Sequence, residues 1–168
     1  MWNIFIGGIL ANDFLKTMNL ETGKSALSNQ TVPKELLSNK KIILPTDIVV
    51  ERNGKKENIS HDSVLENDKI FDIGRKSVET VCDLIKNAKF ILWNGPVGFC
   101  EGGFCEGTES IANAIANSKA VSVVGGGDTL ASVSDEIQSK MTFISTGGGA
   151  MLDYLANENL PGIEALEK

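Results

Sequence analysis

Short apolar runs alternate with amphipathic stretches in the second half of the chain. Four runs have the length and β-branched content of buried strands, at residues 69–74, 89–93, 120–124 and 142–145. Between them lie stretches whose apolar residues recur three or four positions apart, which predicts helices at 77–87, 108–117 and 130–138 and a last one ending at Ala156. Strands that alternate with helices indicate a parallel sheet with right-handed crossovers.

The first half of the chain is less regular, and its clearest signal is a hairpin. Asn53-Gly54 separates two alternating runs, a strong indication of two antiparallel strands. We therefore expect an α/β fold: an open parallel-sheet, Rossmann-like three-layer sandwich with a small antiparallel hairpin excursion. The other elements expected here are a buried strand at 2–6, a helix at 10–18 with Leu10, Phe14 and Leu15 on one face, a short helix from Pro33 to Ser38, and a strand at 41–45.

Four glycine-bearing loops each follow a predicted strand directly. In a parallel sheet such loops lie along one edge, outside the carboxyl ends of the strands, where open α/β folds bind ligands. Free backbone N–H groups at helix N-termini suit phosphate oxygens there, and glycine lets those oxygens reach the backbone. The alternative is that the glycines only make tight turns. The four loops are Gly7-Gly8, Asn94-Gly95-Pro96, Gly125 to Thr129, and Thr146 to Gly149.

Two carboxylates accompany these loops. Asp128 would repel a phosphate unless a cation bridges the two, and Mg²⁺ held by one carboxylate and the phosphates would do so; Asp128 could equally cap the following helix. Glu109 could hydrogen-bond a ribose hydroxyl or simply favour a helix N-terminus. Two known phosphate motifs fail: a Walker A match at Gly23-Lys24-Ser25 would need glycine where Met18 stands, and neither glycine triplet fits G-x-G-x-x-G.

Composition narrows the possible classes of protein. The net charge of −6, without a strong Lys/Arg cluster, argues against nucleic-acid binding, and no apolar stretch is long enough for a membrane span. The start lacks the positive region of a signal peptide. Three irregularly spaced cysteines indicate reduced thiols in a cytoplasmic setting, and with one histidine they cannot supply a zinc site. The lysines nearest the last three strands precede them, so they lie at the edge opposite the glycines.

Several segments together resemble the C-terminal, nucleotide-binding domain of phosphoglycerate kinase. They are LWNGPVG, GTES, VVGGGDTLA and STGGGAMLDYLANENLPGIEAL, preceded in the family's order by IGGILANDFL, LPTDIVV and DIG. The resemblance implies that residues 1–168 are a single partial domain of a glycolytic kinase, a cytoplasmic enzyme that is monomeric at full length. Its reaction transfers a phosphoryl group between the acyl phosphate of 1,3-bisphosphoglycerate and MgADP, giving 3-phosphoglycerate and ATP.

The resemblance also implies roles for particular residues, with ATP or ADP and Mg²⁺ as cofactors. Gly147, Gly148 and Gly149 would present N–H groups to the transferring phosphoryl. The nucleotide would be held by Gly7 and Gly8 on the adenine side, Asn94 and Pro96 around it, Glu109 at the ribose, and Gly126, Gly127, Asp128 and Thr129 at the phosphates, with Asp128 toward Mg²⁺.

The chain also departs from the family pattern. Ile9 stands where a third glycine is frequent, Arg75 where proline follows DIG, and the loop before Gly107-Thr108 is one residue short. The domain that binds 3-phosphoglycerate and an early glycine-lysine loop have no counterpart, so we expect no kinase activity from this chain alone. The alternatives are a nucleotide-binding fragment without catalysis and a structural α/β remnant.

Overall fold

A computed structural model describes residues 2–28 and 30–166, and within it the chain divides into two units. Unit 1 comprises residues 1–84 and 96–111, and unit 2 comprises residues 85–95 and 112 to the end. Helices α3 (Arg75–Asn87) and α4 (Glu106–Ala116) each begin in unit 1 and end in unit 2.

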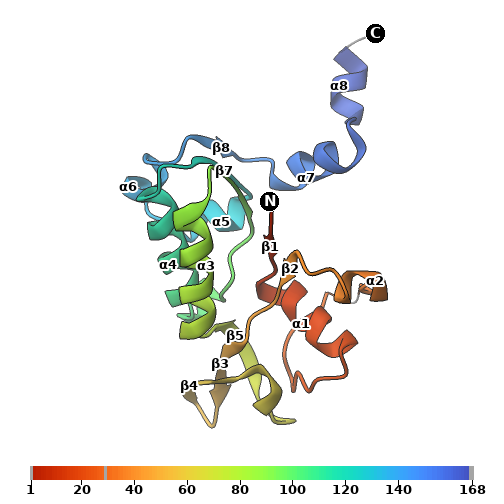
Figure 1. Ribbon diagram of the computed structural model, residues 1–168, viewed down its shortest axis with the longest axis vertical. Helices are drawn as coiled ribbons and strands as arrows, with labels where there is room; N and C mark the ends of the chain where they lie inside the picture. Colours follow the sequence, from red (N-terminus) through yellow and green to blue (C-terminus); the bar gives the residue numbers. More distant parts are fainter. Residues whose placement is uncertain (1, 29, 167–168) are drawn as a thin grey trace. The chain divides into compact units, whose positions relative to one another are not determined.

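Unit 1 contains two small sheets (Figure 1). In the first, β1 and β2 pair in parallel; in the second, β3 is the central strand between β4 and β5, and both neighbours are antiparallel to it. Besides the starts of α3 and α4, the described residues of unit 1 form two helices and two 3₁₀ turns outside these sheets. The bounds are β1 (Ile4–Phe5), α1 (Gly8–Thr17), α2 (Lys34–Leu37), β2 (Ile42–Ile43), β3 (Asp47–Arg52), β4 (Lys55–Ser60), η1 (His61–Ser63), β5 (Lys69–Ile73) and η2 (Cys100–Gly102).

The predicted hairpin is confirmed as β3 and β4. Asn53 and Gly54 form its turn with φ of 53° and 73°, the left-handed values that a tight two-residue turn requires. Ile48 and Val50 point inward from β3 and pack with Val64 in a small core. The third strand, β5, is antiparallel to β3, whereas the regular alternation from residue 69 onward implied a parallel strand.

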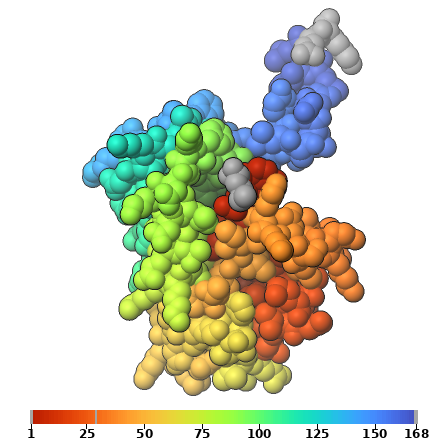
Figure 2. All heavy atoms as spheres, in the orientation of Figure 1, coloured from red at the N-terminus to blue at the C-terminus, as the bar shows by residue number. Residues whose placement is uncertain are grey.

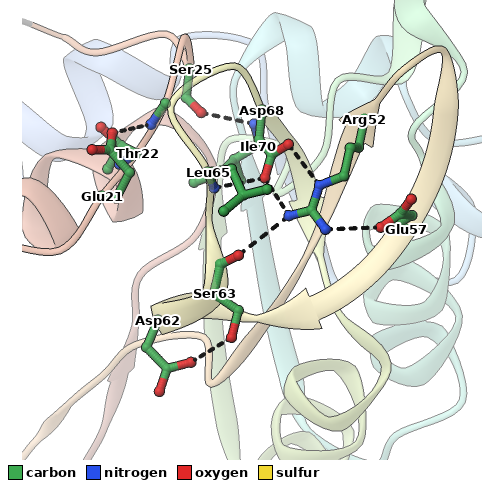
Figure 3. A network of polar contacts seen from close by, with 11 residues as sticks. Glu21, Thr22, Ser25, Arg52, Glu57, Asp62, Ser63, Leu65, Asp68 and Ile70 are labelled. Carbon is green, nitrogen blue, oxygen red and sulfur yellow. Dashed lines mark hydrogen bonds and ion pairs between the residues drawn. The ribbon is translucent and has the colours of Figure 1, made fainter.

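An ion pair between the half-buried Arg52 and the buried Asp68 fixes the far end of this sheet (Figure 3). The Arg52 guanidinium donates to Asp68 through Nε (2.9 Å) and Nη2 (2.6 Å), and to Glu57 through Nη1 (3.1 Å). Asp68 also accepts from the backbone N–H of Leu65 at 2.8 Å. These hydrogen bonds, that from Arg52 above all, hold the pKa of Asp68 below its usual value against the effect of burial. The pair joins β3, β4 and the start of β5.

Unit 2 is built on a three-stranded parallel sheet with the order β6-β7-β8. Every strand here is parallel to its neighbour, as the alternating pattern predicted. The α/β class, with open parallel sheets and an antiparallel hairpin, is therefore confirmed. The bounds are β6 (Phe90–Asn94), β7 (Val121–Gly125), α5 (Gly127–Ala131), α6 (Asp135–Gln138), β8 (Phe143–Ser145), α7 (Gly148–Asn157) and α8 (Pro161–Leu166).

Two expectations about the elements are wrong. The helix expected at 130–138 is broken into α5 and α6, because Gln138 Nε2 donates to the carbonyls of Leu130 (2.9 Å) and Val133 (2.7 Å) and stabilises the turn between them. The first strand is short, and Ile4 is exposed rather than buried. Of the three residues predicted on one face of the first helix, Phe14 and Leu15 are buried and Leu10 is exposed.

The cysteine prediction is also wrong in part. Cys100 and Cys105 form a disulfide, with Cα atoms 4.4 Å apart. The two cysteines are close because the loop between them turns back on itself. The turn is made at Gly103, which follows η2 and adopts a left-handed φ of +81°. Cys82 is the free thiol, and burial raises its pKa.

The helices after β8 lie with much of their apolar surface uncovered. Leu152 and Leu155 of α7 and Leu166 of α8 are exposed, and Figure 2 shows this blue segment with few other atoms of unit 2 over it. Of the helices in the described ranges, none combines the length and apolar character that crossing a membrane requires.

Candidate functional site

Three of the four glycine loops meet at the carboxyl edge of the β6-β7-β8 sheet. Asn94, Gly125 and Ser145 are in register at the ends of the three strands, so the loops that follow them are neighbours. This arrangement agrees with the predicted edge. The fourth loop, Gly7-Gly8, follows β1, which belongs to a separate sheet with β2, so its placement on the same sheet edge is wrong.

Two glycines at this edge are required by the fold. Gly126 adopts φ +98°, which L side chains rarely accept. Gly148 is buried, and a Cβ there would overlap Asn94 Oδ1 and lie 2.5 Å from the backbone nitrogen of Gly126. The loops after β7 and β8 are therefore packed backbone against backbone, with the Asn94 side chain beside both.

Three other glycines have no such structural reason. A Cβ on Gly127 or Gly149 would meet nothing within 4 Å, and one on Gly147 would meet only Ala150 Cβ at 3.8 Å. None of the three has a positive φ. Gly127 and Gly149 lie in the first turns of helices, where alanine would be more stable by about 0.5–1 kcal/mol. The space at the Cβ positions of these glycines is therefore open, a property that neither turn formation nor packing explains.

Two residues predicted to bind nucleotide also organise this edge. Thr129 is fully buried, and its Oγ1 accepts a hydrogen bond from the N–H of Gly95 at 2.8 Å. This contact ties the loop after β6 to helix α5. Asn94 lies at the end of β6 with its side chain partly open to solvent.

Asp128 occupies the first turn of α5 and is exposed. The residue at the N-cap position is Gly126, and this helix start has no side-chain capping hydrogen bond. Asp128 therefore does not cap helix α5, and the capping interpretation is wrong. Within residues 2–28 and 30–166, no group of three His, Cys, Asp or Glu side chains could hold a metal by itself. A cation at Asp128 would thus need further oxygen ligands, such as those of phosphates.

Unit 1 holds the other predicted site residues. A Cβ on Gly7 would lie 2.6 Å from Val97 Cγ1, and one on Gly8 would lie 3.1 Å from the carbonyl oxygen of Pro96. The loop after β1 therefore packs closely on the Pro96-Val97 segment. Glu109 lies exposed in the first turn of α4.

The start of α4 is anchored by two buried polar residues that sequence reasoning missed. Thr108 Oγ1 accepts from the N–H groups of Val97 (3.1 Å) and Gly98 (3.2 Å). Asp72 Oδ2 accepts from the N–H of Gly107 at 2.9 Å, and Oδ1 from that of Ile73 at 2.8 Å. Burial raises the pKa of Asp72 to about 6, although both hydrogen bonds act to lower it.

A second buried carboxylate, that of Asp47, anchors the start of helix α3 in the same way. Asp47 accepts from the N–H groups of Lys76 (3.1 Å) and Ser77 (2.8 Å), from Ser77 Oγ (2.7 Å) and from Asn58 Nδ2 (2.9 Å). Burial opposes its ionisation, but these hydrogen bonds outweigh burial and lower its pKa. The available signal was an aspartate inside an apolar run, in PTDIVV for Asp47 and in KIFDIG for Asp72.

The lysines nearest the three strands lie away from the glycine loops. Lys89, Lys119 and Lys140 precede β6, β7 and β8, so they stand at the amino ends of the strands. Lys140 is paired with Glu136. None of these three lysines therefore lies at the carboxyl edge that carries the glycine loops.

Comparisons with known proteins agree with this geometry. The sequence profile of the phosphoglycerate kinase family matches residues 2–158. Phosphoglycerate kinases from Haemophilus influenzae and Baumannia cicadellinicola are 44% and 40% identical over 98% of this chain. Solved structures of the enzymes from Coxiella burnetii and Pyrococcus horikoshii match 98% of it with TM-scores of 0.84 and 0.78, at 37% and 32% identity.

The chain spans only 44–46% of the length of these relatives. Its fold places it among open α/β proteins with glycine loops at the carboxyl ends of parallel strands. More specifically, the chain belongs to the phosphoglycerate kinase family.

Proposed function

We propose that this chain is the nucleotide-binding part of a phosphoglycerate kinase and binds the phosphates of MgADP or MgATP at the glycine edge of the β6-β7-β8 sheet. The observation that carries the proposal is the set of glycines without a structural reason, Gly127, Gly147 and Gly149. A phosphate oxygen can approach their N–H groups only while no Cβ stands there. The ten-residue helix α7 adds its dipole at the same edge.

Other residues have supporting roles in this proposal. Asp128 holds Mg²⁺ together with the phosphates, which neutralises the repulsion between carboxylate and ligand. Asn94 and Thr129 fix the loops around the phosphates, Thr129 through its hydrogen bond to Gly95. In unit 1, Gly7, Gly8 and Pro96 form the adenine side and Glu109 meets the ribose.

The reaction proposed for the whole enzyme is phosphoryl transfer between 1,3-bisphosphoglycerate and MgADP, giving 3-phosphoglycerate and ATP. In it, Gly147, Gly148 and Gly149 direct their N–H groups at the transferring phosphoryl. Transition-state charge also needs lysine or arginine. The lysines nearest these strands stand at the opposite ends of β6, β7 and β8, so we propose that this chain binds nucleotide without transferring phosphate.

The expected affinity is low. Two helix N-termini contribute at most about 4 kcal/mol, which corresponds to a dissociation constant near 1 mM. At about 10 mM MgADP, binding with that constant stabilises the folded state by about 1.4 kcal/mol. For a chain of this length the melting temperature then rises by about 3–6 °C.

Thermal melts with and without MgADP test the proposal on matched glycine variants. Gly127→Ala and Gly149→Ala should fold normally and lose most of the nucleotide-induced shift, and Asp128→Ala should lose its Mg²⁺-dependent part. Gly162→Ala is the control, because Gly162 also lies in the first turn of a helix and a Cβ there meets nothing within 4 Å. Equal shifts in all three glycine variants would refute the phosphate role. A coupled assay with turnover above background would refute the absence of activity.

A further inference from the structure

The disulfide between Cys100 and Cys105 lies in a loop that is open to solvent. Both cysteines are partly exposed, and residues 101–103 between them are exposed. Cys82, the third cysteine, is a free thiol on α3. Because thiol–disulfide exchange requires that a thiolate reach one of the two sulfurs, this position allows a reductant in solution to attack the bond while the chain is folded.

The conformation of the loop also depends on contacts that do not involve sulfur. The N–H of Phe99 donates to the carbonyl of Phe71 on β5 at 2.8 Å, and the buried Phe104 packs on the Phe71 ring with centroids 4.6 Å apart. Lys56 of β4 donates to the carbonyl of Gly103 and lies over the Phe104 ring. The N–H of Phe104 donates to the carbonyl of Phe99 at 3.0 Å and closes the turn. We therefore expect the two cysteines to stay close together after the bond between them is broken.

The two cysteines differ in their position relative to α4. Cys105 directly precedes this 11-residue helix, and its carbonyl accepts the first helical hydrogen bond, from the N–H of Glu109 at 2.9 Å. Cys105 is therefore the N-cap residue, where the helix dipole and the free N–H groups stabilise a thiolate. Cys100 begins the three-residue turn η2, which is too short to carry a comparable dipole.

The carboxylates beside the disulfide do not remove this difference. Glu101 directly follows Cys100 and Glu106 directly follows Cys105, so each cysteine has one neighbouring negative charge. Glu109 adds a carboxylate one turn along α4, but it is exposed, and solvent screens its charge. The helix start therefore favours Cys105 over Cys100 as the thiolate.

We propose that Cys100 and Cys105 form a reversible redox site that exchanges with dithiol reductants while the chain stays folded. One thiolate of the dithiol attacks Cys100 Sγ, the Cys100–Cys105 bond breaks, and Cys105 leaves as the thiolate at the start of α4. The second thiol of the reagent loses its proton, attacks the mixed disulfide and releases Cys100, which takes up a proton. Two electrons thus pass to the protein, and the dithiol becomes a disulfide. The inference is independent of nucleotide binding.

Mass spectrometry of the full 168-residue chain tests the reversibility. Dithiothreitol in native buffer should open the bond and leave the circular dichroism spectrum unaltered. After its removal, glutathione disulfide should restore the bond without a lasting glutathione adduct on Cys100 or Cys105. The ratio of bonded to glutathionylated chain should fall at least about tenfold in urea, because only the folded turn holds the two sulfurs together. A bond that dithiothreitol opens only in urea, or that does not form again in native buffer, would overturn the proposal.

Alkylation by iodoacetamide at neutral pH tests the roles assigned to the two sulfurs. Cys100→Ser leaves Cys105 free, and Cys105→Ser leaves Cys100 free. Cys105 should react at least about threefold faster than Cys100, because the thiolate is the reactive form and the helix start stabilises it. The difference should disappear in urea, which unfolds α4. Cys82 is the internal control in both variants and should react slowly, since burial raises its pKa. Equal rates in native buffer, or a faster Cys100, would refute the assignment of Cys105 as the leaving thiolate.

Discussion

The buried carboxylate of Asp72 provides a pH-dependent test of how the start of α4 is held. The side chain is 3% exposed and accepts hydrogen bonds from Gly107 and Ile73, yet its pKa is raised to about 6. Glu106 opposes its negative charge and Lys56 favours it, both less strongly than burial acts. In the unfolded chain the carboxyl has the ordinary aspartate pKa of 3.8.

The sign of the effect follows from proton binding. Between the two pKa values the folded state holds more protons at this site than the unfolded state, so the free energy of unfolding falls as the pH rises. Each pKa unit corresponds to about 1.4 kcal/mol, which makes the full contribution about 3 kcal/mol. About 2 kcal/mol of this is lost between pH 4.5 and 7.5.

Asp72→Asn removes the titration while keeping one oxygen acceptor. We expect the free energy of unfolding of this variant, minus that of the parent chain, to rise by about 2 kcal/mol between pH 4.5 and 7.5. Urea unfolding followed by circular dichroism at several pH values measures this difference, in which other groups cancel. Asp153→Asn, at an exposed position of α7, is the control. A difference that stays flat, or that falls with pH, would refute the assigned burial of Asp72.

Three further predictions concern stability and use the same urea assay. Gly148→Ala should cost about 3 kcal/mol because its Cβ meets backbone, whereas Gly149→Ala should be neutral or stabilising; equal effects would contradict the packing described. Asp47→Ala should cost about 2 kcal/mol by uncapping α3, and a loss below about 0.5 kcal/mol would show that water replaces the carboxylate. Reducing the Cys100–Cys105 disulfide should lower the free energy of unfolding by about 2 kcal/mol, because the bond closes a short loop. Cys100→Ser already lacks the bond, so a reductant should cause no further loss of stability in that variant.

Elements whose formation depends on residues close together in the sequence could be predicted from it. The Asn53-Gly54 turn and the helix predicted at 77–87 depend on neighbouring residues. The turn is as predicted, and the helix is present with its start two residues earlier, at Arg75. The break between α5 and α6 depends on Gln138, whose amide reaches back to Leu130, and spacing of apolar residues does not encode that contact. The disulfide was missed because pairing depends on the turn at Gly103.

The candidate site likewise has a part that could be predicted from the sequence and a part that could not. The sequence indicated correctly that three of the four glycine loops meet, because strand ends in a parallel sheet share an edge, but it placed the Gly7-Gly8 loop on that edge as well. It could not identify Asp72 or Asp47, whose roles arise from helices that begin far along the chain from their strands. A carboxylate in an apolar strand is a signal of a buried polar function, but its partner is visible only once the strand and helix are packed.

The two glycine triplets contain glycines of different kinds, and only the structure separates them. Gly126 is needed for its positive φ and Gly148 for close backbone packing, so replacing either tests the fold and not the ligand. Gly127 and Gly149 follow them directly in sequence but have free space where a side chain would stand. Because alanine would stabilise helix starts at these positions, their glycines reduce stability without any gain in folding. Such a cost is expected where function requires an open backbone, which is why the phosphate proposal is tested at Gly127 and Gly149.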